Sequence, residues 1–408
     1  MTANPSSPYP LSNDGLDRLH DSLAARVGPG RLPGLVALVA SGDDVHVETI
    51  GTPSFVDDTP LARDAIFRIA SLSKPIVAVA TLSLVEEGRL RLEDPIDELV
   101  PELAHRRVLR TIDAELDDTV PAHRPITLED LLSYRLGFGS VMAPPGSYPI
   151  QREEAKLGLQ SIGGPPWPPV AHDVDGWIGA LGSLPLLYQP GERWLYNTSG
   201  QVLGVLLARA CGQDLDSVVR DRVFEPLGMV DTGFTVPADQ LGRLTTAYVP
   251  DPETGELTVL DDAADSWWGT PTSFPDAGGW LVSTIGDFWS FVSMLVAGGT
   301  RGGEQILTPA SVGRMTSDQL TPSQREASTL FLGPHGGWGF GLSVPATGSE
   351  DRPLPVGIGW DGGTGTTWRS NRHRGVTGIL FTQRQVASPE PPPLMEDFWA
   401  GINAATER

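Results

Sequence analysis

The sequence predicts a fold of the α/β plus all-α class, in which an antiparallel sheet is flanked by helices and carries a large helical insert. Strand patterns occur near both ends of the 408-residue chain, whereas helical patterns fill its middle. We take the strands of the two ends to form one discontinuous sheet domain, from residues 1–90 and 276–408. Residues 91–275 then form a mainly helical domain, and an active site is expected in the cleft between the two domains.

The strand patterns at both ends support the sheet. Near the start, LPGLVALVASGDDVHVETIG contains two apolar-rich runs joined by a Gly-Asp-Asp turn, which predicts an antiparallel strand pair. Near the end, VGIGWDGGTGTTWRSN and GVTGILFTQR are interpreted as further strands. The last segment, PPLMEDFWAGINAATER, has the pattern of a helix that packs on this sheet.

The middle of the chain supplies the helical patterns. TLEDLLSYRLG and QVLGVLLARAC both have the apolar spacing of helices. They are separated by the proline-rich loop IGGPPWPPV, which includes Trp167. This loop is predicted to be either a lid over the active site or a rigid surface connector.

The composition is that of a soluble enzyme. Apolar residues make up 40% of the chain, and 29 basic against 51 acidic side chains give a formal charge of −22. Such a charge argues against nucleic acid or an anionic membrane as a partner. The start, MTANPSSPYPLSNDG, lacks the basic and apolar regions of a secretory signal, and no apolar run is long enough to cross a bilayer. We therefore predict a cytoplasmic protein, whose oligomeric state the sequence does not indicate.

Lysine is scarce in this chain, which contains only two lysines among its 29 basic residues. Lys74 stands three residues after Ser71 in FRIASLSKPIVAVATLSLVEEG. Because arginine cannot release its proton near neutral pH, a lysine retained against this background is a candidate for amine chemistry. The other lysine, Lys156, follows two glutamates in a polar stretch and is interpreted as a surface charge.

The residues after Ser71 predict a buried helix. The run 76–85 has few polar members and Gly88 provides a left-handed end, so we predict a buried helix of about four turns. Pro75 then falls in the first turn, where its missing N–H costs little. Residues three apart share a helix face, so the Ser71 hydroxyl and the Lys74 amine are expected side by side at the positive end of the helix. The alternative is that Ser71 only caps the helix while Lys74 snorkels to solvent.

Four segments carry a resemblance to a known superfamily. FRIASLSKPI resembles the nucleophile motif of serine β-lactamases and penicillin-binding proteins, whose Ser-x-x-Lys opens a buried helix between two domains. PGERWLYNTSGQVLGVLLARACG resembles the segment that carries the catalytic tyrosine in class C β-lactamases and family VIII carboxylesterases. DAGGWLVSTIGDFWSFVSMLVAGG resembles the glycine-rich turn and helix that follow, and GWDGGTGTTWRSN resembles the strand on the other wall of the site. The resemblance covers roughly residues 15 to 405 and implies a β-lactamase-like fold.

Two departures from the β-lactamase motifs indicate the esterase branch. Where class C β-lactamases have Tyr-x-Asn, this chain has Tyr196-Asn197-Thr198, which keeps the tyrosine and loses the amide at the third position. Where β-lactamases have Lys-[Ser/Thr]-Gly, it has Trp360-Asp361-Gly362, a Trp-x-Gly version that resembles esterases and acyltransferases. No lysine follows Lys156, so the cation that grips a substrate carboxylate is missing. Arg369 could replace it in principle.

The resemblance implies a role for each site residue. Ser71 would attack the carbonyl carbon, Lys74 would hold the proton balance of the hydroxyl, and Tyr196 would act as general base and then as general acid. Whether Lys74 or Tyr196 takes the first proton is left open. The oxyanion hole would consist of the N–H groups of Ser71 and Gly363. Expected substrate contacts are Trp360, Gly362, Thr198 and Trp167.

These observations predict a serine carboxylesterase that cleaves small-molecule esters of small or medium neutral acyl groups through an acyl-enzyme. The alternatives are an acyltransferase with the same acyl-enzyme, or an amide hydrolase of the β-lactamase or D-amino-acid peptidase type. Trp360, the missing lysine and the cytoplasmic location disfavour the amide hydrolase. No cofactor or metal is expected, since the seven histidines lack the spacing of a zinc site. A Gly-x-Ser-x-Gly elbow does not occur in the sequence, which disfavours an α/β-hydrolase.

Overall fold

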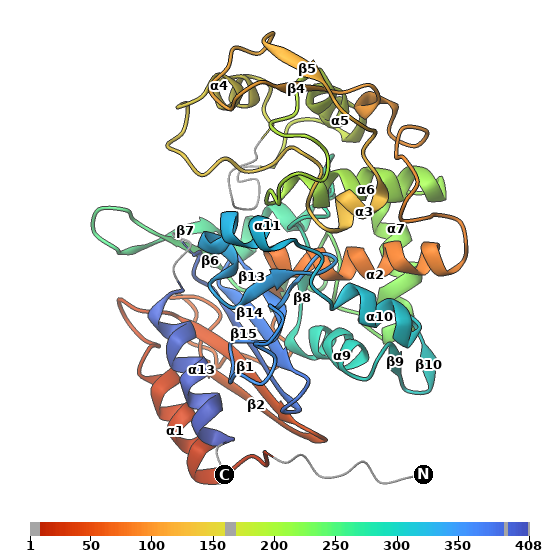
Figure 1. Cartoon of the computed structure of the whole chain (residues 1–408). Coiled ribbons are helices and arrows are strands. Elements are labelled where there is room, and N and C mark those ends of the chain that lie inside the picture. Colours follow the sequence, from red (N-terminus) through yellow and green to blue (C-terminus); the bar gives the residue numbers. More distant parts are fainter. Residues whose placement is uncertain (1–8, 160–168, 387–390, 407–408) are drawn as a thin grey trace.

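A seven-stranded antiparallel sheet brings the two ends of the chain together. The computed structural model describes residues 9–159, 169–386 and 391–406. In the strand order β11-β12-β13-β14-β15-β1-β2, the last strand of the chain pairs with the first (Figure 1). This sheet confirms the predicted fold class. Its strands are β1 (Gly34–Ser41), β2 (Asp44–Gly51), β11 (Gly336–Trp338), β12 (Ser343–Pro345), β13 (Ile358–Gly362), β14 (Thr366–Asn371) and β15 (Val376–Thr382).

Strand β1 shows why the sheet is covered on both faces. All eight of its residues are buried, because successive side chains point to opposite faces and each face carries a core. The odd-numbered residues 35–39 join a cluster with α1 (Asn13–Ala24) and α13 (Pro393–Ala405), which lie side by side on one face (Figure 1). The even-numbered residues 36–40 join the larger cluster on the other face. The predicted first hairpin and the predicted last helix are therefore both present.

The middle of the chain forms a group of helices beyond the sheet (Figure 1). The pattern TLEDLLSYRLG gives only a short helix, since Tyr134 adopts a left-handed φ of 61° soon after it ends. The division into domains at residues 90 and 276 stays a prediction, and buried side chains from both parts join one large cluster. The helices are α3 (Leu128–Leu132), α4 (Pro149–Lys156), α5 (Val174–Ser183), α6 (Thr198–Cys211), α7 (Leu215–Val219) and α8 (Glu225–Leu227), and the paired strands are β4 (Arg107–Leu109) with β5 (Thr119–Pro121) and β6 (Ala247–Pro250) with β7 (Leu257–Asp261).

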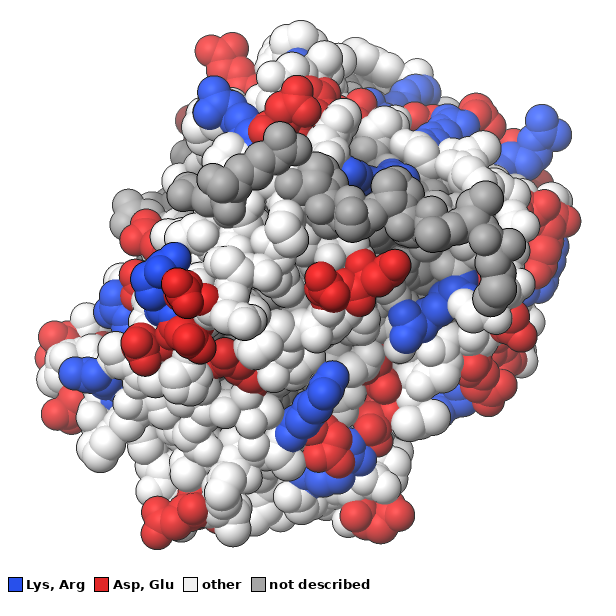
Figure 2. All heavy atoms as spheres, turned by 90° about the horizontal axis from the view of Figure 1, so that it is seen from below, with Lys and Arg blue, Asp and Glu red and all other residues white. Residues whose placement is uncertain are grey.

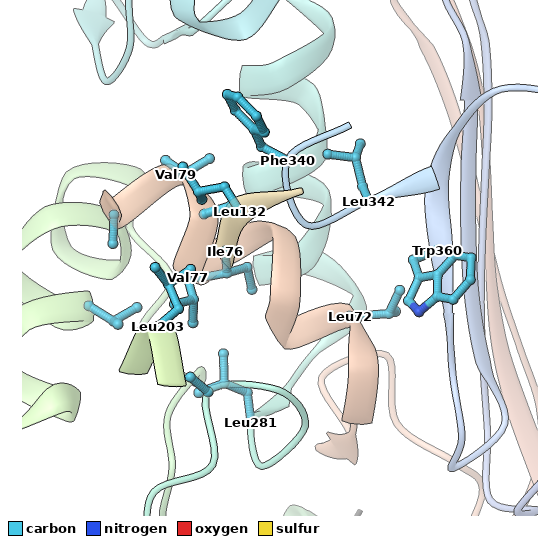
Figure 3. Close-up of a cluster of buried hydrophobic side chains, with 14 of the residues drawn as sticks. Leu72, Ile76, Val77, Val79, Leu132, Leu203, Leu281, Phe340, Leu342 and Trp360 are labelled. Carbon is cyan, nitrogen blue, oxygen red and sulfur yellow. The ribbon is translucent and has the colours of Figure 1, made fainter. Parts of the chain in front are cut away.

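Helix α2 (Ser73–Glu86) is the predicted buried helix. Eleven of its 14 residues are buried, and each large aliphatic side chain among them contributes roughly 1.5–3 kcal/mol to folding. Figure 3 shows Ile76 and Val77 of this helix among apolar side chains from several other elements. Pro75 lies in the first turn, and Gly88, with φ of 71°, follows the helix end and donates its N–H to the Val85 carbonyl at 3.0 Å. Both observations agree with the predicted start and stop of the helix.

The rest of the chain holds the start of α2 in place. The short strands β3 (Phe67–Arg68) and β8 (Val282–Ser283) pair with each other, so the segment before Ser71 runs along the segment that follows residue 276. The remaining elements are α9 (Ile285–Val296), β9 (Thr300–Arg301), β10 (Glu304–Gln305), α10 (Pro309–Met315), α11 (Pro322–Ala327) and α12 (Thr329–Leu332).

The surface shown in Figure 2 carries charges of both signs. On the face shown in Figure 2, basic side chains lie scattered among acidic ones. Within the described residues, the helices are all too short or too polar to span a bilayer. The cytoplasmic location stays a prediction from the sequence.

Candidate active site

A tight turn of 3-10 helix, η1 (Ala70–Leu72), presents Ser71 directly before α2. Ala70 has a φ of 45°, which is a strained conformation for a residue with a β-carbon. The turn is held from two sides, because the Ile69 N–H donates to the Leu281 carbonyl at 2.9 Å and the Thr366 hydroxyl donates to the Ile69 carbonyl at 3.1 Å. Ser71 is thus fixed between the sheet and the loop before β8.

Lys74 lies against Ser71, as the helical spacing predicted. The Lys74 Nζ is 2.8 Å from the Ser71 Oγ and 3.0 Å from the Asn197 Oδ1, and it also donates to the Gly278 carbonyl. Burial lowers the pKa of Lys74 from its ordinary 10.5 to about 7, and the negative charge of Asp276 opposes this change. Near neutral pH, a substantial share of Lys74 is therefore the uncharged amine that can accept a proton.

Tyr196 completes the group predicted from the sequence. Its ring lies beneath the amine, with the Lys74 Nζ 4.7 Å from the ring centroid. Its hydroxyl oxygen accepts a hydrogen bond from the Trp360 Nε1 at 2.7 Å. Burial raises the pKa of Tyr196, although hydrogen bonds with Ser71 and Trp360 act in the opposite direction. The side chain is consequently a neutral phenol at neutral pH, and Lys74, which is itself partly uncharged, does not turn it into a phenolate.

Tyr196 sits within a cluster of aromatic rings that fixes its position. The ring centroids of Trp338 and Trp360 lie 4.7 Å apart in an edge-on arrangement, and Trp360 in turn packs 5.6 Å from Tyr196. Trp360 is only 5% exposed and lies near Leu72 at the start of α2 (Figure 3). In this structure, the indole that the sequence assigned to a substrate-facing wall holds the tyrosine hydroxyl.

The other predicted contacts lie around the same turn. A β-carbon on Gly362 would come within 2.4 Å of the Ile69 carbonyl oxygen, so β13 approaches the Ser71 turn as closely as a glycine permits. Gly363 follows directly, and its carbonyl accepts from the Val386 N–H at 2.8 Å. Thr198 is buried, and its hydroxyl has no hydrogen-bond partner within the described part of the chain. Trp167 and all but the last two residues of its loop lie outside the described residues, so the lid and the connector both stay predictions.

Arg369 is engaged by a neighbour. Its guanidinium binds both carboxylate oxygens of Asp361, at 3.0 and 2.7 Å. Such a bidentate pair occupies the fork of nitrogen atoms with which arginine would grip a substrate carboxylate. The replacement for the missing lysine that the sequence left open is therefore already paired within the protein.

Three site residues, Asp276, Gly278 and Asn197, were not assigned a role from the sequence. Asp276 is buried, and its oxygens accept from the Gly278 N–H at 2.7 Å and from the Gln201 side-chain amide at 3.0 Å. Burial raises the pKa of Asp276, whereas Lys74 lowers it. By fixing the Gly278 turn, Asp276 aims the Gly278 carbonyl at Lys74. The third residue, Asn197, supplies the amide oxygen next to Lys74.

A cavity of about 230 Å³, lined by aromatic, aliphatic and hydroxyl-bearing side chains, adjoins Tyr196. Its described lining contains no charged side chain, and Met142 and Leu330 at its rim are 53% and 60% exposed. Neither Ser71 nor Lys74 lines this cavity. Larger cavities of about 750 Å³ beside α1 and α13, about 510 Å³ beside α6 and about 450 Å³ beside the end of α2 include none of Ser71, Lys74 and Tyr196. Within the described ranges, no group of three or more His, Cys, Asp or Glu side chains is placed to hold a metal ion.

Known proteins are similar to this chain in sequence. A family model described as Beta-lactamase matches residues 19–394. Protein Rv1367c of Mycobacterium tuberculosis is 38% identical over 364 residues, which cover 87% of each chain. Esterase EstB of Burkholderia gladioli is 28% identical over 411 residues, which cover 94% of each chain.

A solved structure has a similar fold. EstCE1, described as a hydrolase with promiscuous acyltransferase activity, superposes with a TM-score of 0.76 over 95% of this chain and 98% of its own, and at 22% identity it shows the fold alone. The family model spans most of the sequence, and the Ser-x-x-Lys turn opens the buried helix as in the superfamily that the motifs resemble. The chain therefore belongs to the beta-lactamase family, within the serine β-lactamase and penicillin-binding-protein superfamily, and it has esterase relatives.

Proposed function

We propose that this protein is a serine carboxylesterase of the family VIII type, which cleaves esters of small or medium neutral acyl groups through an acyl-enzyme. The observation that carries the proposal is the buried Lys74 amine, with a pKa of about 7, at 2.8 Å from the Ser71 hydroxyl. Serine needs a base to become a nucleophile, and a lysine can act as that base only when it is uncharged. The esterase relative EstB of Burkholderia gladioli supports this reaction type.

In the first half of the reaction, the Lys74 amine takes the Ser71 proton while the Ser71 oxygen attacks the ester carbonyl carbon. The N–H groups of Ser71 and Gly363 would stabilise the oxyanion that forms. The neutral Tyr196 phenol then gives its proton to the departing alkoxide and is reprotonated through Lys74. In the second half, water attacks the acyl-enzyme and releases the acid, with the same groups moving the proton in reverse.

Neutral substrates are supported by the surroundings of the site. Arg369 is paired with Asp361, and the cavity beside Tyr196 is lined by uncharged side chains. A carboxylate-bearing β-lactam or peptide would find no unpaired cation among these residues. We place the site in the cleft between the helical part and the sheet part, because Lys74 bonds Asn197 of the former and Gly278 of the latter.

The function is tested by comparing two substrates on the wild type. We expect turnover of p-nitrophenyl butyrate, with a kcat/KM for a chromogenic cephalosporin lower by about 10- to 100-fold or more, because the hydrogen bonds to a substrate carboxylate are missing. The Ser71→Ala variant measures background hydrolysis. Faster turnover of the cephalosporin than of the ester would assign the protein as an amide hydrolase instead of an esterase. A wild type that turns over neither substrate would refute the proposal.

An acyltransferase uses the same acyl-enzyme and differs only in the acceptor that attacks it. The description of EstCE1, a hydrolase that also transfers acyl groups, favours testing this second function. A primary alcohol is added at increasing concentration while acid and new ester are both quantified. We expect the acid to dominate; a product ester that dominates at low millimolar alcohol would assign the protein as a transferase.

Replacing Tyr196 by phenylalanine tests its role as a proton donor. We expect kcat/KM to fall by about 100-fold or more for an ethyl ester, since an alkoxide needs a proton to leave. The loss is expected to be smaller for the p-nitrophenyl ester of the same acid, because p-nitrophenolate leaves without a proton. Equal losses for the two esters would contradict the donor role and favour Tyr196 as the first base.

A further inference from the structure

We infer that Asn197 is a positioning residue that directs the lone pair of the neutral Lys74 amine at the Ser71 hydroxyl. It would thereby replace, from the neighbouring chain position, the amide that the Tyr-x-Asn motif loses at Thr198. The inference rests on the proposed function, because it concerns how the Ser71 nucleophile is activated.

The hydrogen bonds of Lys74 define the direction of its lone pair. Two of its three neighbours, the Asn197 Oδ1 and the Gly278 carbonyl oxygen, only accept hydrogen bonds, whereas the Ser71 hydroxyl can also donate. A neutral amine has two N–H bonds and one lone pair. When the two N–H bonds are used by the two obligate acceptors, the lone pair is left pointing at Ser71. The hydroxyl proton of Ser71 then lies on the path to the Lys74 nitrogen.

The backbone at Asn197 explains how its side chain reaches the amine. With φ of 80° and ψ of −65°, Asn197 is the centre of a γ-turn that is rare for a non-glycine residue. The turn is closed by the Thr198 N–H, which donates to the Tyr196 carbonyl at 3.2 Å. This reversal lets two consecutive residues contact Lys74, Tyr196 through its ring and Asn197 through its amide. Strained residues cluster at functional sites, and Ala70 next to Ser71 is a second example here.

The Asn197 side-chain amide is uncharged, and this affects the protonation of the Lys74 amine. Lys74 already faces the buried carboxylate of Asp276, which favours the ammonium form, and the phenol of Tyr196. The charge of Asp361 helps to raise the pKa of Tyr196, and Tyr196 in turn helps to raise the pKa of Tyr134. An amide oxygen orients the amine without adding a second negative charge. A carboxylate in its place would hold Lys74 as ammonium, which cannot accept the Ser71 proton.

Two variants at this position separate orientation from folding. Glycine adopts a positive φ freely, and aspartate matches asparagine in shape, so Asn197→Gly and Asn197→Asp should keep the turn with no more strain than the wild type. Glycine removes the acceptor, whereas aspartate keeps it and adds a charge. The pH dependence of kcat/KM for p-nitrophenyl butyrate is measured for both variants and the wild type, with Ser71→Ala in parallel.

We expect the two variants to move the acidic limb of the pH profile in opposite directions. Asn197→Asp should shift the limb by about one pH unit or more toward alkaline pH and regain activity above it, because the charge raises the pKa of Lys74. Asn197→Gly should shift the limb slightly toward acidic pH and lower kcat by about 10- to 100-fold with a smaller change in KM, since the amine is no longer oriented.

The outcomes distinguish this inference from the proposed function. If Ser71→Ala is inactive while both Asn197 variants keep the wild-type limb and kcat, Asn197 is not a positioning residue and the esterase assignment stands. If Ser71→Ala keeps wild-type turnover, the proposed function itself fails. An Asn197→Asp enzyme that is folded and never regains activity at alkaline pH also overturns the inference. A variant that only unfolds is recognised by a lowered midpoint of thermal unfolding and by an equal loss of activity at all pH values.

Discussion

Replacing Ser71 by alanine is expected to lower kcat for p-nitrophenyl butyrate by about four orders of magnitude or more, because removal of a serine nucleophile leaves only binding and oxyanion stabilisation. The Ser71 oxygen is the hydroxyl oxygen that Lys74 contacts at 2.8 Å, and the change removes a single atom from a side chain that is 8% exposed. We therefore expect the fold to be kept. Mass spectrometry of the quenched wild type should show an acyl adduct on the peptide with Ser71, and the variant should show none.

Ser73 offers a matched control for this experiment. It lies two residues away in the same buried turn, and its hydroxyl donates to the Ala70 carbonyl at 2.6 Å and accepts from the Leu281 N–H at 3.2 Å. These bonds hold the turn and do not face Lys74. Ser73→Ala should lower the midpoint of thermal unfolding yet retain the acyl adduct. An adduct on Ser73, or turnover that survives in Ser71→Ala, would refute the assignment of the nucleophile.

The sequence was sufficient for the features that depend on local spacing. The first hairpin was predicted from two apolar-rich runs around a Gly-Asp-Asp segment. In the structure Ser41 pairs with Asp44, and Gly42 between them has the left-handed φ of 60° that such tight turns require. The proximity of Ser71 and Lys74 follows from three-residue spacing at a helix start. Tyr196 came from a motif, and the structure brings it to the same amine.

The features that the sequence did not reveal depend on contacts across long chain distances. Asp276 reaches the site through the Gly278 turn, 204 residues after Lys74 in the chain. The role that we propose for Asn197 depends on a γ-turn, and no sequence pattern distinguishes that turn from the first residues of α6. The pairing of Arg369 with Asp361 needed the register of two adjacent strands. In each case the sequence contains the residue but does not indicate which other residue it contacts.

Replacing Lys74 by methionine is expected to reduce ester turnover by about 100- to 10,000-fold, the usual contribution of a general base. It should also change how stability depends on pH. The folded pKa of about 7 lies below the ordinary 10.5, so between these values the unfolded chain binds a proton that the folded protein does not. Raising the pH through this window therefore favours the folded wild type, and the variant lacks this contribution.

The free energy of unfolding of the wild type, relative to Lys74→Met, should rise by about 1.4 kcal/mol per pH unit, or about 2–3 kcal/mol between pH 7 and pH 9. Urea unfolding of both proteins at pH 7, 8 and 9 measures this difference, in which the titration of all other groups cancels. Lys156→Met is the matched control, because Lys156 is an exposed lysine whose side chain is 70% accessible and pairs with Glu153 at 2.8 Å. If the free energy of unfolding changes with pH in the same way in the wild type and in Lys74→Met, the buried amine keeps its proton at neutral pH. Lys74 would then be unable to accept the proton of Ser71, and the proposed mechanism would lose its base.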